Sequence, residues 1–262
     1  MAGEIYYPLI HDMTWSHSRL QSFSDCPYRW YLRYIRQLPG EPMFFASYGS
    51  FIHGLLDRYY SGELSYDALL PAYLTGFRDA VQGRPPSHKV FSSYFLDGQR
   101  FFSTFRPLPY KTIQSEQRIA CEIDGAPFIC ILDHIGQSEN GLVITDHKSR
   151  KLSPRSRRAK PTKNDRLIDD YMLQLYRYAE PVRQAFGEYP AELALDCFRS
   201  GIVIRETFDK TVFRSVREQI KPQIEKIEQT ERFGPNIEYF KCMYLCEMHG
   251  WCDYCRVNFM ER

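Results

Sequence analysis

The sequence predicts a domain of mixed α and β structure, α+β or α/β, in which helices flank a central mixed sheet. Apolar residues follow helical spacing up to about residue 108, and strand-like segments begin at about residue 111. The expected order is several helices, three strands, a long helix, two strands and a last helix. We expect one domain over residues 1–262, with a helical part at about 15–108, a sheet core at about 111–232 and a cysteine-rich tail at about 235–262.

The composition excludes several classes of protein. Basic residues number 34 and acidic residues 32, so the net charge says little about partners. No apolar run is long enough to span a membrane, and the N-terminus lacks the pattern of a secretory signal. Eight cysteines without such a signal argue against a disulfide scaffold and favour thiols that bind a metal or pack in the core. We therefore expect a cytoplasmic protein.

Helices in the first part are predicted from apolar spacing and from residues that start or stop helices. Residues 1–14 look irregular. A short helix is expected to begin after Ser16 or Ser18, to break near Cys26-Pro27 and to resume up to about Gln37. Longer helices are expected at about 46–61, 65–82 and 90–105.

Strands in the second part are separated by turn residues. Asp124-Gly125 and Asn140-Gly141 are both typical of two-residue hairpin turns. They separate strands at about 113–123, 128–135 and 142–149. A further hairpin is expected around Ser200-Gly201, with strands at about 192–199 and 202–208, and the last helix is expected at about 210–232.

The Asn140-Gly141 turn allows the pairing of two strands to be predicted. If these are the two central turn residues, Glu139 pairs with Leu142. Asp133 then falls opposite Lys148. A slip of one residue would move Asp133 to the other face of the sheet, so the register decides which side chains meet.

Asp146 and Lys148 lie two residues apart at the end of the third strand, where side chains of such residues point to one face. Alone, this pair is common by chance and is most often a surface charge pair. The predicted pairing adds Asp133 to the same face, next to Asp146. Two close carboxylates repel each other unless a cation lies between them, and oxygen ligands suit Mg²⁺ or Mn²⁺. The three residues therefore predict a divalent-metal site beside a lysine.

A basic segment follows this strand. Residues 150–163 contain no acids and cannot form a regular helix throughout, because Pro154 and Pro161 interrupt them. The segment is either a solvated, mobile loop or a surface that holds phosphates beside the metal site. Its basic residues are Arg150, Lys151, Arg155, Arg157, Arg158, Lys160 and Lys163.

Polar residues on two expected helices have a role that spacing alone does not decide. His53 lies on the helix at 46–61, where a single histidine is more often structural than a ligand. A long helix is expected at about Asp165–Phe186, with a kink at Pro181. Gln174 and Tyr178 lie on one side of it, and spacing alone does not decide whether that side faces the solvent or the metal site.

Four cysteines crowd the tail, with the spacing Cys242-x3-Cys246-x5-Cys252-x2-Cys255. Short segments rarely bury so many thiols, so metal ligation is favoured. Thiolates select zinc or an iron–sulfur cluster. The ligands are either these four, or Cys26 with three of them, which would join the two ends of the chain. Spacing does not choose between these sets.

Together these motifs resemble the PD-(D/E)XK nuclease superfamily in its RecB-like branch, and within it the single-domain iron–sulfur exonucleases of phages and CRISPR loci. The resemblance covers most of the chain, and the order and spacing of the motifs make it specific. The motifs that carry it are Ser18-x-Leu20-x5-Cys26-Pro27-x-Arg29-x-Tyr31, Gly49-x3-His53, the single acid Asp133, Asp146-x-Lys148, Gln174-Leu175-x2-Tyr178 and the cysteine tail.

The resemblance implies a restriction-endonuclease-like core and a role for each polar residue. His53, Asp133 and Asp146 would hold Mg²⁺ or Mn²⁺, with the backbone carbonyl of His147 as a further ligand. Lys148 would orient the attacking water and stabilise charge on the phosphate. Two residues of the long helix, Gln174 and Tyr178, would contact DNA or the lysine. Glu116, in the first strand, is a weaker candidate.

The sequence departs from the family pattern at two places. Leu132 stands where the family name has a proline. The tail has one cysteine too many, with a first gap of three residues instead of two. The resemblance favours a [4Fe–4S] cluster on Cys26, Cys242, Cys246 and Cys252, which keeps the five-residue gap and leaves Cys255 spare. The second choice is Cys26 with Cys246, Cys252 and Cys255, and zinc remains an alternative metal.

The implied activity is metal-dependent hydrolysis of DNA, by an exonuclease that acts on single strands or duplex ends. The basic loop at 150–163 would contact the DNA. Protein partners of recombination or CRISPR adaptation would fit such an enzyme, in a bacterial cell or a phage-infected host. Two alternatives stay open: a non-catalytic DNA-binding or adaptation subunit that keeps the fold, and a zinc-stabilised interaction module.

Overall fold

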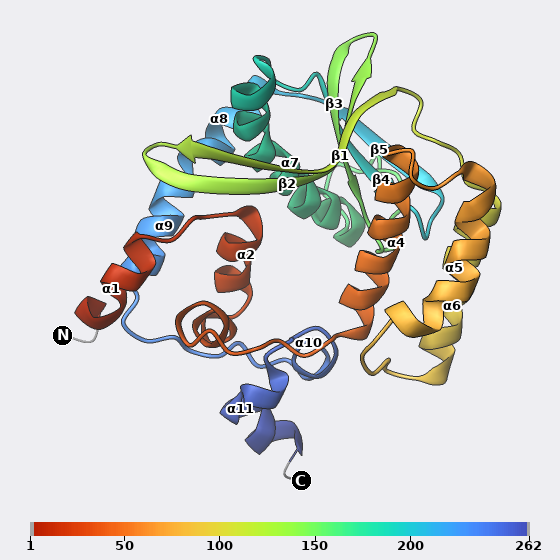
Figure 1. Ribbon diagram of the computed structural model, residues 1–262. Helices are drawn as coiled ribbons and strands as arrows, with labels where there is room; N and C mark the ends of the chain where they lie inside the picture. The colour runs from red at the N-terminus through yellow and green to blue at the C-terminus, as the bar shows by residue number, and fades with distance from the viewer. Residues whose placement is uncertain (1–2, 261–262) are drawn as a thin grey trace.

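A five-stranded mixed sheet forms the centre of the computed structural model, which describes residues 3–260 (Figure 1). The strands lie in the order of the sequence: β1 (Lys111–Ile123), β2 (Ala126–Ser138), β3 (Gly141–His147), β4 (Glu192–Cys197) and β5 (Ile202–Thr207). β3 and β4 pair in parallel, and the other neighbours pair antiparallel. The predicted fold class, helices around a mixed sheet, is confirmed.

The long helix α7 (Lys163–Phe186) makes the crossover between the parallel strands β3 and β4. Thr162 and Asp165 cap its start: the Thr162 hydroxyl accepts the Asp165 N–H at 3.2 Å, and the Asp165 carboxylate accepts the Thr162 N–H at 2.7 Å. Gly187, with φ of 83°, ends the helix in a left-handed conformation. Pro181, where the sequence predicts a kink, lies inside this helix, which continues past it to Phe186.

The register between β2 and β3 differs from the prediction by two residues. The turn is formed by Glu139 and Asn140, and Leu142 pairs with Gln137 instead of Glu139. Ser138 favours this turn, because its hydroxyl accepts the Asn140 N–H at 3.2 Å and reaches the Gly141 carbonyl at 3.0 Å. Side chains alternate with a period of two, so a shift of two residues keeps every side chain on its predicted face.

The helical part agrees with the sequence in its larger elements. Ser16 caps the first expected helix by accepting the Arg19 N–H at 3.1 Å, and Cys26 separates that helix from the next. The elements are α2 (His17–Asp25), α3 (Pro27–Trp30), the π-helical turn η1 (Tyr31–Ile35), α4 (Phe44–Tyr60), α5 (Tyr66–Ala80) and α6 (His88–Ser103).

Two helical regions differ from the prediction. Residues expected to be irregular form α1 (Gly3–His11), in which Ile10 is fully buried against other apolar side chains. The helix expected at 210–232 is divided into α8 (Lys210–Glu218) and α9 (Ile220–Glu228). Pro222 explains the break, because it has no N–H to donate and its ring would clash with the carbonyl of residue 218 in a continuous helix.

Apolar packing joins these elements in four clusters. The largest lies between the sheet and α7, and a second, rich in aromatic rings, lies among α4, α5 and α6. A third packs α1, α2 and α9 against the β1–β2 hairpin, and a fourth surrounds the cysteines of the tail. The tail elements are α10 (Tyr239–Tyr244), η2 (His249–Trp251), α11 (Asp253–Cys255) and η3 (Arg256–Met260). In Figure 1, α2 and α4 lie below the sheet on its two sides, and α10 lies below them.

Candidate active site

Asp133, in the middle of β2, and Asp146, near the end of β3, lie on neighbouring strands. Asp133 accepts the backbone N–H of His147 at 2.8 Å, which ties the two strands beyond their last ladder pair. Asp146 is buried, and its Oδ2 lies 2.6 Å from the Nζ of Lys148. The structure therefore brings together the two carboxylates and the lysine that the sequence singled out.

His53, Glu116 and Asp133 form a cluster that could hold a metal ion. Their ligand atoms all lie within 4.8 Å of one another. His53 Nδ1 lies 3.4 Å from Asp133 and 3.8 Å from Glu116, while its Nε2 donates to the carbonyl of His147 at 2.7 Å. Of the expected ligands, His53 thus contacts Asp133 through Nδ1 and the His147 carbonyl through Nε2. Asp146 is not part of this cluster and pairs with Lys148 instead.

Electrostatics of this cluster favour a cation at its centre. Burial opposes the charge on His53, but the carboxylates of Asp133 and Glu116 outweigh it and raise the pKa of His53 to about 10. Burial likewise opposes ionisation of Asp133, but His53 lowers the pKa of that carboxyl to about 2. A protonated imidazole therefore stands between the carboxylates, where a divalent cation would meet the same negative charges.

Glu116 reaches the cluster through an unusual backbone. Its φ is 46°, in the left-handed region that a residue with a Cβ rarely adopts. Such a conformation costs on the order of 1–3 kcal/mol and persists where the surrounding structure enforces it. Glu116 lies between two regular pairs of β1 with β2, Ser115 with His134 and Gln117 with Leu132. The strain is therefore local and coincides with the carboxylate that joins the cluster.

Gln174 connects the acid and the lysine of β3. Its Oε1 accepts from Lys148 at 2.9 Å, and its Nε2 donates to Asp146 at 2.7 Å and to the Tyr178 hydroxyl at 3.1 Å. Burial disfavours the charge on Lys148, but attraction to Asp146 outweighs it and keeps the pKa of Lys148 above its usual value. The ammonium also lies 4.7 Å from the ring centre of Tyr171. Lys148 is thus a fixed cation.

The imidazole of His147 points to the opposite face of β3 from Asp146 and Lys148, as alternation dictates, and its ring meets the His53 ring edge to face, with centres 5.7 Å apart. Its Nδ1 lies 2.8 Å from the carboxylate of Asp196 on β4, its parallel partner in the ladder. The Tyr60 ring stacks against it, with the ring centres 6.2 Å apart. Asp196 was not predicted from the sequence, and only the parallel pairing of β3 and β4 reveals it.

Residues 14–253 match the family profile of the PD-(D/E)XK nuclease superfamily. The chain belongs to this superfamily. A crystal structure from Eubacterium rectale, of a protein provisionally assigned as an exonuclease, has the same fold, with a TM-score of 0.55 over 98% of this chain and 90% of that chain. At 16% identity this likeness concerns the fold alone. A search of curated proteins finds no match.

Membership of the PD-(D/E)XK superfamily makes the chain a nuclease by family and implies nucleic acid as its substrate. These nucleases usually use divalent metal ions, and the cluster of His53, Glu116 and Asp133 is compatible with one. Within residues 3–260, no helix is long and apolar enough to cross a membrane.

The basic loop of this PD-(D/E)XK chain is anchored, contrary to the idea of a wholly solvated segment. Leu152 is buried, and Asp165 accepts hydrogen bonds from the N–H and hydroxyl of Ser156 at 2.8 and 2.6 Å. Arg155 pairs with Asp169 and Glu206, at 2.6 and 2.5 Å. Among the basic residues of this loop, five are exposed and make no ion pair with another described residue: Arg150, Arg157, Arg158, Lys160 and Lys163.

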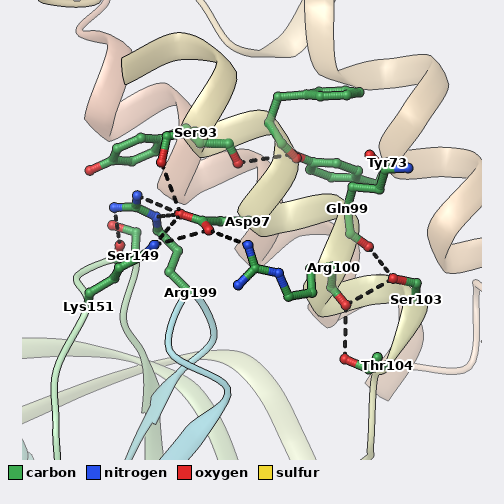
Figure 2. A network of polar contacts seen from close by, with 12 residues as sticks. Tyr73, Ser93, Asp97, Gln99, Arg100, Ser103, Thr104, Ser149, Lys151 and Arg199 are labelled. Atoms are coloured by element: carbon green, nitrogen blue, oxygen red, sulfur yellow. Dashed lines mark hydrogen bonds and ion pairs between the residues drawn. The ribbon is translucent and has the colours of Figure 1, made fainter. Parts of the chain in front are cut away.

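Asp97 on α6 fixes the start of this loop (Figure 2). This buried carboxylate pairs with Lys151 at 2.9 Å and with Arg199 of the β4–β5 turn at 2.8 Å. Arg199 also donates to the carbonyl of Ser149 at 3.4 Å and lies against the Tyr94 ring. The chain just beyond Lys148 is thereby held against the helical part, and Lys151 is already paired inside the protein.

All five candidate cysteine ligands line one cavity of about 160 Å³. Cys242, Cys252 and Cys255 are buried, and Cys246 is half-buried. Cys26 reaches the cavity from the start of α3, where its sulfur accepts the N–H of Arg29 at 3.5 Å. Among the described residues, no three of these thiols lie within 4.8 Å of one another, although Cys255 is close enough to interact with both Cys242 and Cys252.

Proposed function

We propose that this PD-(D/E)XK chain is a divalent-metal-dependent deoxyribonuclease, and more narrowly an exonuclease that acts on single strands or duplex ends. The observation that carries this proposal is the joint presence of a carboxylate–histidine cluster and a fixed lysine. His53, Glu116 and Asp133 are close enough to share one cation, and Lys148 is held beside Asp146 at 2.6 Å. A metal ion and a lysine at one phosphate can together stabilise the charge that develops during phosphodiester hydrolysis.

The metal would be held by His53, Asp133 and Asp146, with the His147 carbonyl and Glu116 completing the set. Carboxylate and carbonyl oxygens suit Mg²⁺ or Mn²⁺. When bound, such an ion lowers the pKa of a water molecule and polarises the phosphodiester. The proton on His53 that the cluster holds would be released, because a metal-binding imidazole must be neutral.

Lys148 would contact the scissile phosphate or the attacking water, since its ammonium keeps its charge in a largely buried position. Gln174 fixes this ammonium and the Asp146 carboxylate with two separate atoms, at 2.9 and 2.7 Å. Tyr178 holds Gln174 in turn at 3.1 Å. Gln174 and Tyr178 are thus positioning residues for the acid and the lysine, and their role depends on geometry more than on charge.

DNA would be held by the exposed cations of the anchored loop. Arg157, Arg158 and Lys160 are exposed, and cations of this kind release counter-ions when they bind phosphates. Arg150 and Lys163 flank them on the two sides of the loop. Lys151 and Arg155, by contrast, already pair with acids of the protein, so we assign them mainly to holding the loop.

The cysteine cavity supports a [4Fe–4S] cluster on Cys26, Cys242, Cys246 and Cys252, with Cys255 as the alternate ligand. Its volume of about 160 Å³ is about five times the ~30 Å³ that one water molecule occupies in the liquid. A four-thiolate zinc site brings all of its sulfur atoms within about 4 Å of one another, whereas no three of these thiols lie that close together in the described residues. A cluster here would join α3 to the tail.

A panel of end-labelled DNA tests the proposed activity. The protein, purified without oxygen, is incubated with Mn²⁺ and with linear single strands or duplexes labelled at the 5′ or the 3′ end. A closed circular single strand serves as the control. Shortening of linear DNA with an intact circle supports an exonuclease. Cutting of the circle would replace it with an endonuclease, and no cleavage of any DNA would contradict the proposal and leave a DNA-binding subunit.

A further inference from the structure

Arg177 is a buried cation without an anionic partner. It lies on α7, next to Tyr178, and is 3% exposed. Its two terminal nitrogens donate to neutral groups, His17 Nδ1 at 3.1 Å and Gln223 Oε1 at 2.8 Å, and its Nε has no partner. No carboxylate within the described residues forms an ion pair with it, although burial of an uncompensated charge disfavours the folded state. A salt bridge within the described residues therefore does not explain why the charged side chain of Arg177 is buried.

The contact with Arg177 fixes the tautomer of His17. A guanidinium only donates, so the His17 Nδ1 must accept, and the ring proton of a neutral imidazole then sits on Nε2. Burial, Arg177 and Lys148 together lower the pKa of His17 to about 3, which keeps the ring neutral. His17 thus presents one oriented N–H donor. Its Nε2 has no hydrogen-bond partner among the described residues. This atom is also absent from the buried unpaired polar atoms, so it is in contact with solvent.

His17 lies close to the candidate catalytic residues. Its ring meets the Tyr178 ring edge to face, with centres 6.4 Å apart, and the Tyr178 hydroxyl bonds to Gln174. The charge of Lys148 is near enough to affect His17. His17 is also the first residue of α2, directly after the cap Ser16. The His17 N–H donor therefore lies at the edge of the candidate active site, where the start of α2 meets α7.

We propose that His17 is a substrate-contacting residue whose Nε2–H donates to a backbone phosphate next to the scissile one, with Arg177 as the residue that orients it. The proposal rests on the proposed nuclease function and adds a binding position to it. The phosphate of a bound strand would supply the negative charge that Arg177 lacks. The His17 ring would lie between the two, with Arg177 on Nδ1 and the phosphate on Nε2. A contact to a phosphate that does not react should affect substrate binding more than the chemical step.

Two amide substitutions separate this role from a purely structural one. In His17→Gln the side-chain amide nitrogen can occupy the Nε2 position and keep the donor to the substrate. In His17→Asn the amide oxygen can occupy the Nδ1 position and keep the acceptor for Arg177. Binding of single-stranded DNA is measured by fluorescence anisotropy with Ca²⁺ in place of Mn²⁺, and KM and kcat are measured with Mn²⁺.

We expect His17→Asn to raise Kd and KM about tenfold with little change in kcat, as loss of a hydrogen bond to a charged group predicts. His17→Gln should stay within about threefold of the unaltered protein. His88 is the matched control, because it too is the first residue of a helix after a serine cap, Ser87, and it is exposed on α6. His88→Asn should leave Kd and KM unchanged.

Three results would overturn the inference. If His17→Asn binds DNA normally and His17→Gln does not, the histidine serves only as an acceptor for Arg177. If both variants bind and cleave like the unaltered protein, His17 does not contact the substrate. If kcat falls while Kd is unchanged, its role lies in the chemical step. A protein that neither binds nor cleaves DNA before any substitution would instead contradict the proposed function itself, and the inference with it.

Discussion

At the scale of single residues, the candidate active site is held by carboxylates whose charges are balanced within the protein. Asp133 faces His53, and Asp146 faces Lys148. Gln174 then sets the distance between the acid and the lysine. Each carboxylate therefore keeps its position without a metal ion, and the site is prepared for one by geometry.

The strained residue Glu116 offers a test at this scale. Glu116→Gln keeps the shape of the side chain but removes the negative charge from the cluster, so the affinity for a divalent cation should fall. We expect the Mn²⁺ concentration that gives half-maximal cleavage to rise by about tenfold, with the fold intact. A titration of activity against Mn²⁺ measures this. Glu122→Gln, an exposed substitution in the same strand, is the control, and an equal Mn²⁺ requirement in both variants would exclude Glu116 as a ligand.

The residues of the site could be predicted from the sequence to different degrees. Asp133 and Asp146 were placed on one face by turn chemistry, and the two-residue error in register did no harm, because alternation has a period of two. His53 and Gln174 could be assigned only through resemblance to a family, because helical spacing does not tell which face of a helix meets a sheet. The contact of His17 with Arg177 depends on the packing of α2 against α7, which no local pattern encodes.

At the scale of elements, the basic loop is anchored at both ends and exposes its cations between them. Asp97 holds Lys151 at one end and Asp165 holds Ser156 and Thr162 at the other. Simultaneous substitution Arg157→Ala, Arg158→Ala and Lys160→Ala should weaken DNA binding at low salt. It should also reduce the slope of log affinity against log salt concentration by about two, since each of the three lost phosphate contacts removes about 0.7 unit on single-stranded DNA.

Anisotropy titrations at several salt concentrations measure this slope. The control removes the same number of exposed basic residues from α8 and α9, by substituting Lys210, Arg214 and Lys221 with alanine. The control should keep the slope of the unaltered protein. An unchanged slope in the loop variant would show that the loop does not contact phosphates.

The end of α7 gives a prediction for stability against pH. Burial opposes ionisation of Glu180, but hydrogen bonds from Arg183, Gln184 and Tyr189 outweigh it and lower its pKa to about 2. Because this pKa lies below that of an unfolded glutamate, about 4.3, the stabilisation is complete above about pH 4.3 and is lost as the pH falls toward 2. It should amount to on the order of 2 kcal/mol.

Urea unfolding at a series of pH values measures this effect. Glu180→Gln should lower the free energy of unfolding at pH 7 and flatten its decrease between pH 4.5 and pH 3. The exposed Glu188 lies near the same end of the helix, and Glu188→Gln should leave both unchanged. A profile for Glu180→Gln parallel to that of the unaltered protein would mean that Glu180 does not carry this dependence.

The elements themselves were predictable where local signals agree. The strong hairpin turns located β1 to β3 within a few residues, and the predicted bounds of the long helix fall within two residues of α7. The helix expected at 210–232 is divided in two because Pro222 interrupts an otherwise helical pattern. The helix α1 was missed because its stability comes from burial of Ile10 against distant residues, and apolar spacing over nine residues is a weak signal.

At the scale of the whole molecule, the candidate site is assembled from segments far apart in the sequence. α4 supplies His53, β2 and β3 supply the carboxylates, α7 supplies Gln174, and α2 supplies His17 (Figure 1). The tail closes this arrangement by packing against α3 and η1. Glu247 pairs with Arg29 at 2.7 Å and Arg33 at 2.5 Å, so polar contacts join the chain ends beside the cysteines.

A cluster on the cysteines would add a second link between the chain ends. Without it, the tail should detach more easily, and the melting temperature should fall by about 10 °C if several kcal/mol are lost. Cys252→Ser, which removes a ligand common to both candidate sets, should give a colourless protein with this lower melting temperature. Visible absorbance, iron and zinc analysis, and thermal unfolding measure the effect.

Two further substitutions choose between the ligand sets. If Cys26, Cys242, Cys246 and Cys252 bind the cluster, Cys255→Ser keeps the colour and Cys242→Ser loses it. The opposite pattern would select the set with Cys255. Zinc in place of iron in the unaltered, anaerobically purified protein would contradict an iron–sulfur cluster altogether.

Asp146 and Lys148 carry the central claim, that they act together in phosphodiester hydrolysis. The direct test is single-turnover cleavage of 5′-labelled single-stranded DNA with Mn²⁺ by the unaltered protein, Asp146→Asn and Lys148→Met. DNA binding with Ca²⁺ confirms that each variant still holds its substrate. We predict that both substitutions reduce the cleavage rate by at least ~10³-fold while Kd changes little. Cleavage by either variant at the rate of the unaltered protein would contradict the account.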